Sequence, residues 1–158
     1  MELYLVRHGV AVDADSTVSD EARPLSARGR EQFAAGVRGL ERIGVRFDRL
    51  LHSPLLRAVE TAELMTPLLS GESAVTELLT RAPTEELLRE LAGLRTALVG
   101  HEPLLSELAA WLATGARESA GAFALEKGGL VVLEGEPKPG SMRLAAFLPP
   151  RLLRELAR

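Results

Sequence analysis

Apolar positions along the chain form two kinds of pattern, short continuous runs and longer runs with helical spacing. Short runs typical of buried strands cover residues 3–9, 47–52, 95–99 and 141–147. Apolar residues recur every three or four positions in the stretches expected to be helical, which are residues 26–43, 54–65, 85–94, 103–112 and 152–156. Strands that alternate with helices predict an α/β fold, here a three-layer α/β/α sandwich with a mostly parallel central sheet.

Polar residues, glycines and prolines mark where these elements end. Ser26 is expected to cap the N-terminus of the first helix, and Gly44 to follow its C-terminus. Pro54 is predicted at the first position of the second helix, and Thr84 at the N-cap of the third. Three less regular segments complete the prediction: a loop over residues 10–24, an extended segment over 74–79, and a hairpin of residues 122–126 and 129–134 that turns at Gly128-Gly129.

Composition narrows the class of protein. The chain has 158 residues, of which 46% are apolar and 26% charged, so we predict one domain with its own core over residues 1–158. A net charge of -3 gives no reason to expect nucleic acid or an anionic membrane as partner. The absence of cysteine excludes disulfides, thiolate metal sites and cysteine nucleophiles. No apolar run approaches the roughly 18 residues of a membrane span, and no basic signal region opens the chain, so we expect a cytoplasmic protein.

Histidine and arginine follow several of the predicted strands. The first strand ends in Arg7-His8, the second is followed by Arg57 on the next helix, and a later strand ends at His101. Because the carboxyl ends of parallel strands meet at one edge of a sheet, we expect these four side chains to surround one pocket. Two guanidinium groups suit a phosphate, and a neutral imidazole can attack phosphorus while a second donates a hydrogen bond. The pattern predicts a metal-free site for phosphoryl transfer.

The segments that carry these residues resemble the histidine phosphatase superfamily, the phosphoglycerate mutase-like branch 1 group. The matching segments are Leu5-Val6-Arg7-His8-Gly9, Ser53-Pro54-Leu55-Leu56-Arg57-Ala58 with Thr61-Ala62, and Val99-Gly100-His101. Nearly the whole chain is covered. The short length and Arg23-Pro24-Leu25-Ser26 are most similar to the small phosphohistidine phosphatases, which lack the insertions that cover the pocket in mutases. The resemblance implies the phosphoglycerate mutase-like fold in a single histidine phosphatase domain over residues 1–158.

The resemblance also implies a role for each residue of the predicted pocket. His8 would be the nucleophile, forming a phosphohistidine intermediate that water then discharges. Arg7, Arg57 and His101 would bind the phosphate together with it. No cofactor and no metal ion are implied. His52 is expected to be an ordinary residue at the end of its strand, because no spacing of histidines supports a metal centre.

The general acid is open between two carboxylates. Asp20 lies three residues before Arg23, in the loop after the first strand, and is the preferred candidate. Glu77 lies between the second arginine and the second histidine, where larger relatives place a glutamate. Asp13 and Asp15 are expected to be solvated surface residues.

The predicted substrate is phosphohistidine on a protein such as a phosphotransfer domain, because a pocket without a lid admits a protein surface. A small-molecule phosphomonoesterase of the same superfamily is the enzymatic alternative. A non-catalytic phosphate-binding module is the alternative from another class. Glu102, which follows His101, is expected to discourage some polyanionic substrates. We expect a monomer or a weak homodimer whose partner is a phosphorylated protein or a small phosphorylated metabolite.

Overall fold

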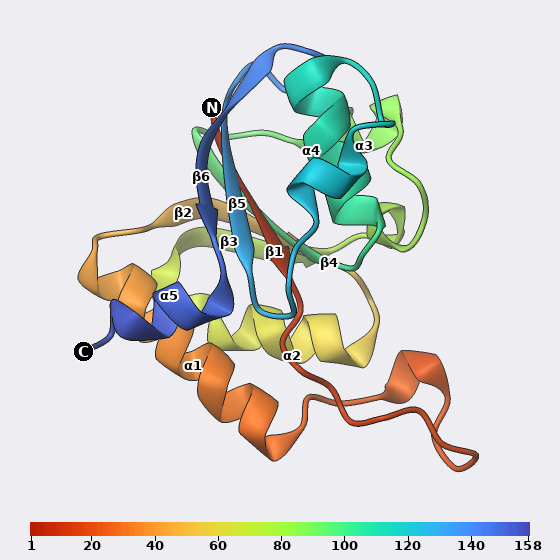
Figure 1. Cartoon of the computed structure of the whole chain (residues 1–158), viewed down its shortest axis with the longest axis vertical. Coiled ribbons are helices and arrows are strands. Elements are labelled where there is room, and N and C mark those ends of the chain that lie inside the picture. Colours follow the sequence, from red (N-terminus) through yellow and green to blue (C-terminus); the bar gives the residue numbers. More distant parts are fainter.

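One six-stranded sheet forms the centre of the molecule in the computed structural model, which describes residues 1–158 (Figure 1). The strands are β1 (Glu2–Arg7), β2 (Phe47–His52), β3 (Leu69–Val75), β4 (Arg95–Gly100), β5 (Leu130–Gly135) and β6 (Met142–Leu148). They lie in the order β3-β2-β4-β1-β5-β6. The pairs β3–β2, β2–β4 and β4–β1 are parallel, whereas β5 runs antiparallel to both of its neighbours. The predicted, mostly parallel sheet is confirmed.

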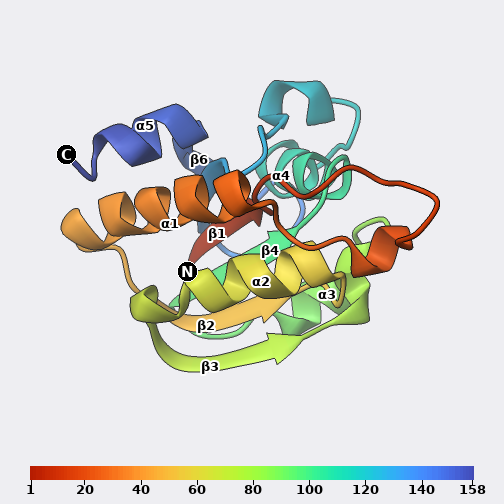
Figure 2. The same ribbon diagram turned by 90° about the horizontal axis from the view of Figure 1, so that it is seen from below.

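Helices cover both faces of this sheet. The helices are α1 (Ala27–Arg42), α2 (Leu56–Leu64), α3 (Glu85–Glu90), α4 (Leu104–Thr114) and α5 (Pro150–Glu155). Short 3-10 turns are η1 (Asp20–Ala22), η2 (Thr66–Leu68), η3 (Glu77–Thr80) and η4 (Ala120–Phe123). One buried cluster joins α1, α2 and α5 to the sheet, and a second joins α3 and α4 to the other face. Figure 2 shows α1 and α2 side by side along the first face. The molecule is therefore an α/β/α sandwich, as predicted.

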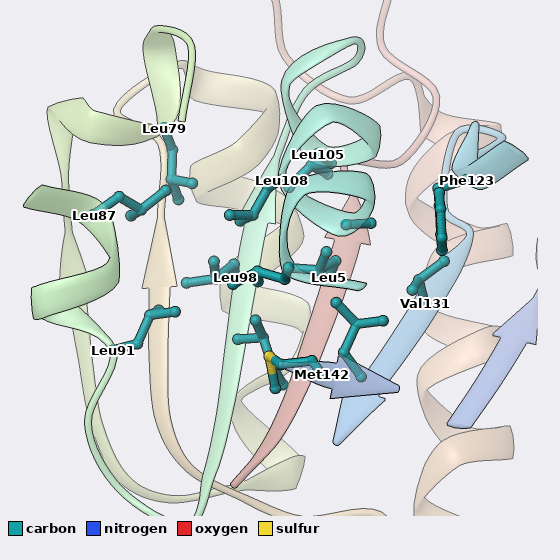
Figure 3. Close-up of a cluster of buried hydrophobic side chains, with 14 of the residues drawn as sticks. Leu5, Leu79, Leu87, Leu91, Leu98, Leu105, Leu108, Phe123, Val131 and Met142 are labelled. Carbon is teal, nitrogen blue, oxygen red and sulfur yellow. The ribbon is translucent and has the colours of Figure 1, made fainter. Parts of the chain in front are cut away.

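The alternation of side chains along β1 explains why both faces are buried. Leu3 and Leu5 point into the cluster with α3 and α4, while Tyr4 and Val6 point into the cluster with α1, α2 and α5. Figure 3 shows Leu5 among the leucines of α3, α4 and β4, in the cluster that α3 and α4 form with the sheet. A central strand covered on both sides reads as a continuous apolar run, which is the pattern that the sequence shows.

Local signals for helix ends are confirmed at three positions. The Ser26 hydroxyl accepts a hydrogen bond from the Gly29 backbone N–H at 2.9 Å, and α1 begins one residue after it. The Thr84 hydroxyl accepts from Leu87 N–H at 3.4 Å at the start of α3. Gly44 follows α1 with a φ of 81°, a conformation that glycine adopts without strain.

Two helix ends differ from the prediction. Helix α2 begins at Leu56, because the preceding Leu55 is extended, with a ψ of 133°, and Pro54 therefore lies outside the helix. Helix α3 ends at Glu90, four residues before the predicted end, since Leu91 is extended, with a ψ of 109°.

The less regular segments differ more. The extended segment predicted over residues 74–79 overlaps only the end of β3, which runs over Leu69–Val75. The rest of that segment forms a 3-10 turn, whose N-cap is Thr76. Residues 120–123 form η4, so the hairpin is made by β5 and β6 instead. Gly128 is in a turn, but its N–H donates to the carbonyls of Arg7 and His8 at 3.1 and 3.0 Å. This turn therefore joins the start of β5 to the end of β1. No helix is long and apolar enough to cross a bilayer.

Candidate active site

The ends of β1, β2 and β4 bring the predicted side chains to one edge of the sheet. Arg7 is paired with Gly100, so the residues that follow them, His8 and His101, lie side by side. His8 N–H still donates to the Gly100 carbonyl at 3.1 Å, and the centres of the two imidazole rings are 5.1 Å apart. Arg57 reaches the same place from the first turn of α2. His8, His101 and Arg57, which come from separate segments, therefore meet, and Arg7 is close enough for its charge to act on both imidazoles.

His8 is held in one tautomer. Its Nδ1 lies 2.7 Å from the Gly9 carbonyl oxygen, which can only accept, so Nδ1 carries the proton. Nε2 is then left with a lone pair, and it accepts a hydrogen bond from Arg57 Nε at 3.3 Å. Burial, together with the positive charges of Arg57 and Arg7, lowers the pKa of His8 to about 3. His8 is thus neutral at physiological pH, with an unprotonated nitrogen facing a guanidinium.

His101 is bonded to a serine of the neighbouring strand end. Its Nε2 lies 2.8 Å from the hydroxyl of Ser53, which is fully buried. The same hydroxyl accepts from the Leu55 N–H at 3.3 Å. Nδ1 of His101 is buried without a hydrogen-bond partner. Burial, and then the charge of Arg57, lowers the pKa of His101 to about 4, so this imidazole is also neutral at physiological pH.

Arg57 has a protein partner at each of its guanidinium nitrogens. Besides Nε on His8, its NH1 donates to the Asp20 carbonyl at 2.7 Å and its NH2 donates to Asp20 Oδ2 at 3.2 Å. The side chain is only 7% exposed. Nε therefore faces His8, whereas NH1 and NH2 are turned toward Asp20, and each of these two nitrogens has a second N–H that an oxyanion can use.

Asp20 reaches the site from η1 and is ion-paired there. Its carboxylate accepts from Arg23 Nε at 2.9 Å as well as from Arg57. The hydrogen bond from Arg23, followed by the charge of Arg57, lowers the pKa of Asp20, although its side chain is 60% exposed. The preferred candidate for the general acid is therefore close to the predicted pocket and ionised at neutral pH.

The side chain of Arg7 makes a single hydrogen bond within the chain. Its NH1 donates to the Leu125 carbonyl at 2.6 Å, and its Nε is buried without a partner. The guanidinium is therefore less constrained by the protein than that of Arg57, and it has donors left for an anion.

The other candidates lie apart from this cluster. Glu77 is exposed in η3, and its carboxylate has no hydrogen bond or ion pair with the residues above. His52 ends β2, as predicted, with Nδ1 3.0 Å from the Ser53 carbonyl. Asp13 and Asp15 are exposed, as predicted, and Asp15 caps the local turn at Thr17. No group of three or more His, Asp or Glu side chains is placed to hold a metal ion.

The sequence did not indicate several residues that hold the site together. The Thr61 hydroxyl accepts from the Gly9 N–H at 3.1 Å and donates to the Arg57 carbonyl at 2.6 Å, which links the loop after β1 to α2. Thr61 belongs to a matching motif, but the motif by itself indicates no role for its hydroxyl. Leu125 contributes through its main-chain carbonyl, which every residue has, so its residue type could not indicate this role.

An enclosed hollow lies elsewhere in the molecule, apart from this site. It lies between α1, α5 and β5 and is lined mostly by apolar and glycine residues, among them Phe33, Leu130 and Leu153. Its room of about 20 Å³ fits one water molecule, and neither His8 nor His101 lines it. We regard it as a gap in the packing beneath the loop after β1.

Known proteins resemble this chain in sequence and in fold. Residues 3–81 match the sequence model of the histidine phosphatase superfamily (branch 1). An uncharacterised protein from Picosynechococcus sp. is 34% identical over 156 residues, which span 92% of this chain and 90% of that protein. The SixA structure from Agrobacterium tumefaciens has a TM-score of 0.72 and 25% identity, and the match covers 94% of this chain and 97% of that one.

A second solved structure, the protein histidine phosphatase SixA complexed with tungstate, has a TM-score of 0.77 and 23% identity, covering 97% of this chain and 99% of that one. At 23% identity, the similarity to this second structure supports the fold alone. The sequence match over residues 3–81 and the relative of similar length decide the family. The chain belongs to the histidine phosphatase superfamily, branch 1.

Proposed function

We propose that this protein is a phosphatase in which His8 attacks phosphorus. The observation that carries the proposal is the state of His8: Nδ1 is tied to the Gly9 carbonyl, and the Nε2 lone pair faces the guanidinium of Arg57. A neutral, oriented imidazole beside a fixed cation is what nucleophilic attack on a phosphoryl group requires.

The reaction follows from these positions in two steps. In the first, the phosphoryl oxygens take over the donors of Arg57 and Arg7, and an N–P bond forms at His8 Nε2. The bond from phosphorus to the leaving group breaks at the same time, and the leaving group departs with the electron pair and takes a proton from solvent. In the second, water attacks phosphorus and releases a proton to solvent, the N–P bond breaks with its electron pair returning to Nε2, and inorganic phosphate leaves. Arg7 and Arg57 stabilise the charge on the phosphoryl oxygens in both steps, and His101 contributes a hydrogen bond.

Asp20 serves this reaction by orienting Arg57. Because its pKa is lowered, the carboxylate of Asp20 is ionised at neutral pH, so its role as general acid stays a prediction. Phosphohistidine needs little help from a dedicated acid, because its leaving nitrogen is readily protonated. A sugar alkoxide needs far more help. The position of Asp20 therefore favours a phosphoramidate substrate over an alkyl phosphate.

The proposed substrate is phosphohistidine on a protein. The SixA protein from Agrobacterium tumefaciens matches this chain over 97% of its own length, so neither chain has a long added segment to cover the pocket relative to the other. A site at the carboxyl edge of a sheet can receive a side chain carried by another protein.

The experiment compares turnover of a histidine-phosphorylated phosphotransfer domain, a phosphoserine peptide and a panel of sugar phosphates. We expect the phosphorylated domain to give the highest kcat/KM, and His8→Ala to lower it by at least about 10³-fold. His52→Ala is the matched control, since the only hydrogen bond of its ring is to the carbonyl of the adjacent Ser53. Higher turnover of a sugar phosphate would make the protein a small-molecule phosphomonoesterase, and phosphate binding without any turnover would make it a binding module.

Trapping the intermediate tests the nucleophile directly. The reaction is run with a substrate that carries a labelled phosphoryl group and is quenched without acid. The label is then expected on His8 as an acid-labile, base-stable adduct. Labelled enzyme in the His8→Ala variant would overturn the assignment.

A further inference from the structure

Glu102 follows His101 directly, and its carboxylate is turned toward the protein. Oε1 accepts from the Leu125 N–H at 2.8 Å, and Oε2 accepts from the Ser106 hydroxyl at 2.6 Å. No arginine or lysine is paired with this carboxylate, whereas Asp20 and Glu60 have such partners. The carboxylate therefore ties the loop before β5 to the first turn of α4.

Leu125 is the residue that the carboxylate holds, and it is also the anchor of Arg7. Its N–H donates to Glu102, its carbonyl accepts from Arg7 NH1 at 2.6 Å, and its side chain is buried in the cluster with α4. The Leu125 carbonyl is the only hydrogen-bond acceptor that the chain offers to the Arg7 guanidinium. The orientation of Arg7 therefore depends on the placement of this one residue.

We propose that Glu102 is a positioning residue that orients Arg7 for phosphate through the main chain of Leu125. The inference rests on the proposed function, because it takes the phosphate pocket as the place where Arg7 acts. Removal of the carboxylate frees the Leu125 N–H, lets the segment before β5 move, and loosens the Arg7 guanidinium. A displacement of about 1 Å at such a group is enough to cost on the order of 10²-fold in rate.

This role differs from the one expected from the sequence, in which the charge of Glu102 repels polyanions. The two can be separated by Glu102→Gln and Glu102→Asp. Gln keeps an oxygen for the Leu125 N–H and can donate to Ser106, but it has no charge. Asp keeps the charge and withdraws the carboxylate by one methylene group. Positioning predicts normal behaviour for Gln and a defect for Asp, whereas repulsion predicts tighter anion binding for Gln and no change for Asp.

The test measures binding of inorganic phosphate and of tungstate to the unreacted protein by calorimetry, together with KM and kcat. We expect Glu102→Ala and Glu102→Asp to weaken phosphate binding and raise KM by about tenfold or more, and Glu102→Gln to stay within about threefold of the parent protein. Glu107→Ala is the control, because it removes a carboxylate from α4, the helix to which Glu102 is tied, and this carboxylate makes no side-chain hydrogen bond. If Glu102→Ala does not fold, Glu102→Asp carries the comparison.

A double-mutant cycle with Arg7 distinguishes positioning from a general loss of structure. In an Arg7→Ala background, the further change Glu102→Ala is expected to weaken phosphate binding by less than about twofold, because its effect is transmitted through Arg7. Additive losses, or normal phosphate binding in Glu102→Asp, would overturn the proposal. Phosphate binding that depends on Glu102 in a protein without turnover would instead contradict the phosphatase function and leave the positioning role standing.

Discussion

The Nε atom of Arg57 lies 3.3 Å from Nε2 of His8, while the other two nitrogens of the same guanidinium are bonded to Asp20. One buried cation thus joins the unprotonated nitrogen of His8, at the end of β1, to the 3-10 turn that follows it in the chain. The contact orients Arg57, and its positive charge adds to the burial that lowers the pKa of His8 and keeps the imidazole neutral.

Acidification is expected to destabilise the protein well before its carboxylates are protonated. Burial lowers the pKa of His8 to about 3 and that of His101 to about 4. Below about pH 6.5 the unfolded chain binds protons on these imidazoles that the folded chain does not bind. The free energy of unfolding should therefore fall as the pH is lowered from about 6.5 toward 4. Denaturant unfolding at a series of pH values measures this slope, which should be smaller in His8→Ala. An NMR titration of the His8 ring with a midpoint near 6.5 would contradict the prediction.

Asp20→Asn tests whether Asp20 orients Arg57 or donates a proton. The amide keeps an acceptor for Arg57, and the backbone carbonyl that accepts from NH1 is unchanged. Because the ion pair is exposed on one side, we expect a loss in kcat/KM of less than about tenfold. The factor should be the same for phosphohistidine and for an alkyl phosphate. A loss that grows with the pKa of the leaving group would show that Asp20 is the general acid.

Thr61→Val is expected to destabilise the fold and weaken catalysis together. The substitution leaves the buried Gly9 N–H without its acceptor and the Arg57 carbonyl without the hydroxyl donor. An unpartnered buried group of this kind costs about 1–3 kcal/mol, measurable by chemical unfolding. Thr61→Ser retains the hydroxyl and should stay close to the parent protein in both stability and kcat/KM. A normal Val variant together with a defective Ser variant would assign the role of Thr61 to its methyl group.

Gly29→Ala is expected to destabilise the protein, although alanine is normally the better helix former. A Cβ at Gly29 would collide with the backbone carbonyl of Val10, in the loop directly after Gly9. The cost should be about 1–3 kcal/mol, with lower turnover because this loop carries the carbonyl that fixes His8. Gly121→Ala is the control, since a Cβ there meets nothing within 4 Å. A Gly29→Ala variant more stable than the parent protein would contradict the prediction, because it would show that the loop moves away from the added Cβ without cost.

Much of the fold could be read from local patterns because those patterns have local causes. Ser26 and Thr84 cap their helices through hydrogen bonds to residues three positions away, so a short stretch of sequence contains the whole interaction. Helix α2 shows the limit of such signals. Pro54 is compatible with a helix start, yet the Ser53 hydroxyl is shared between the Leu55 N–H and His101, and the helix begins later.

The sequence by itself determined the sandwich architecture, the family, and the side chains at the strand ends, because the continuous apolar runs, the helical spacing and the motifs around Arg7, Arg57 and His101 depend on residue type alone. Only the tertiary structure decided how those side chains are held. The Gly9 carbonyl sets the tautomer of His8 and the Leu125 carbonyl anchors Arg7, and both are main-chain groups that every residue possesses. Glu102 acquires its partner from a segment more than twenty residues away. Contacts of this kind depend on where the folded backbone runs, and residue type does not encode them.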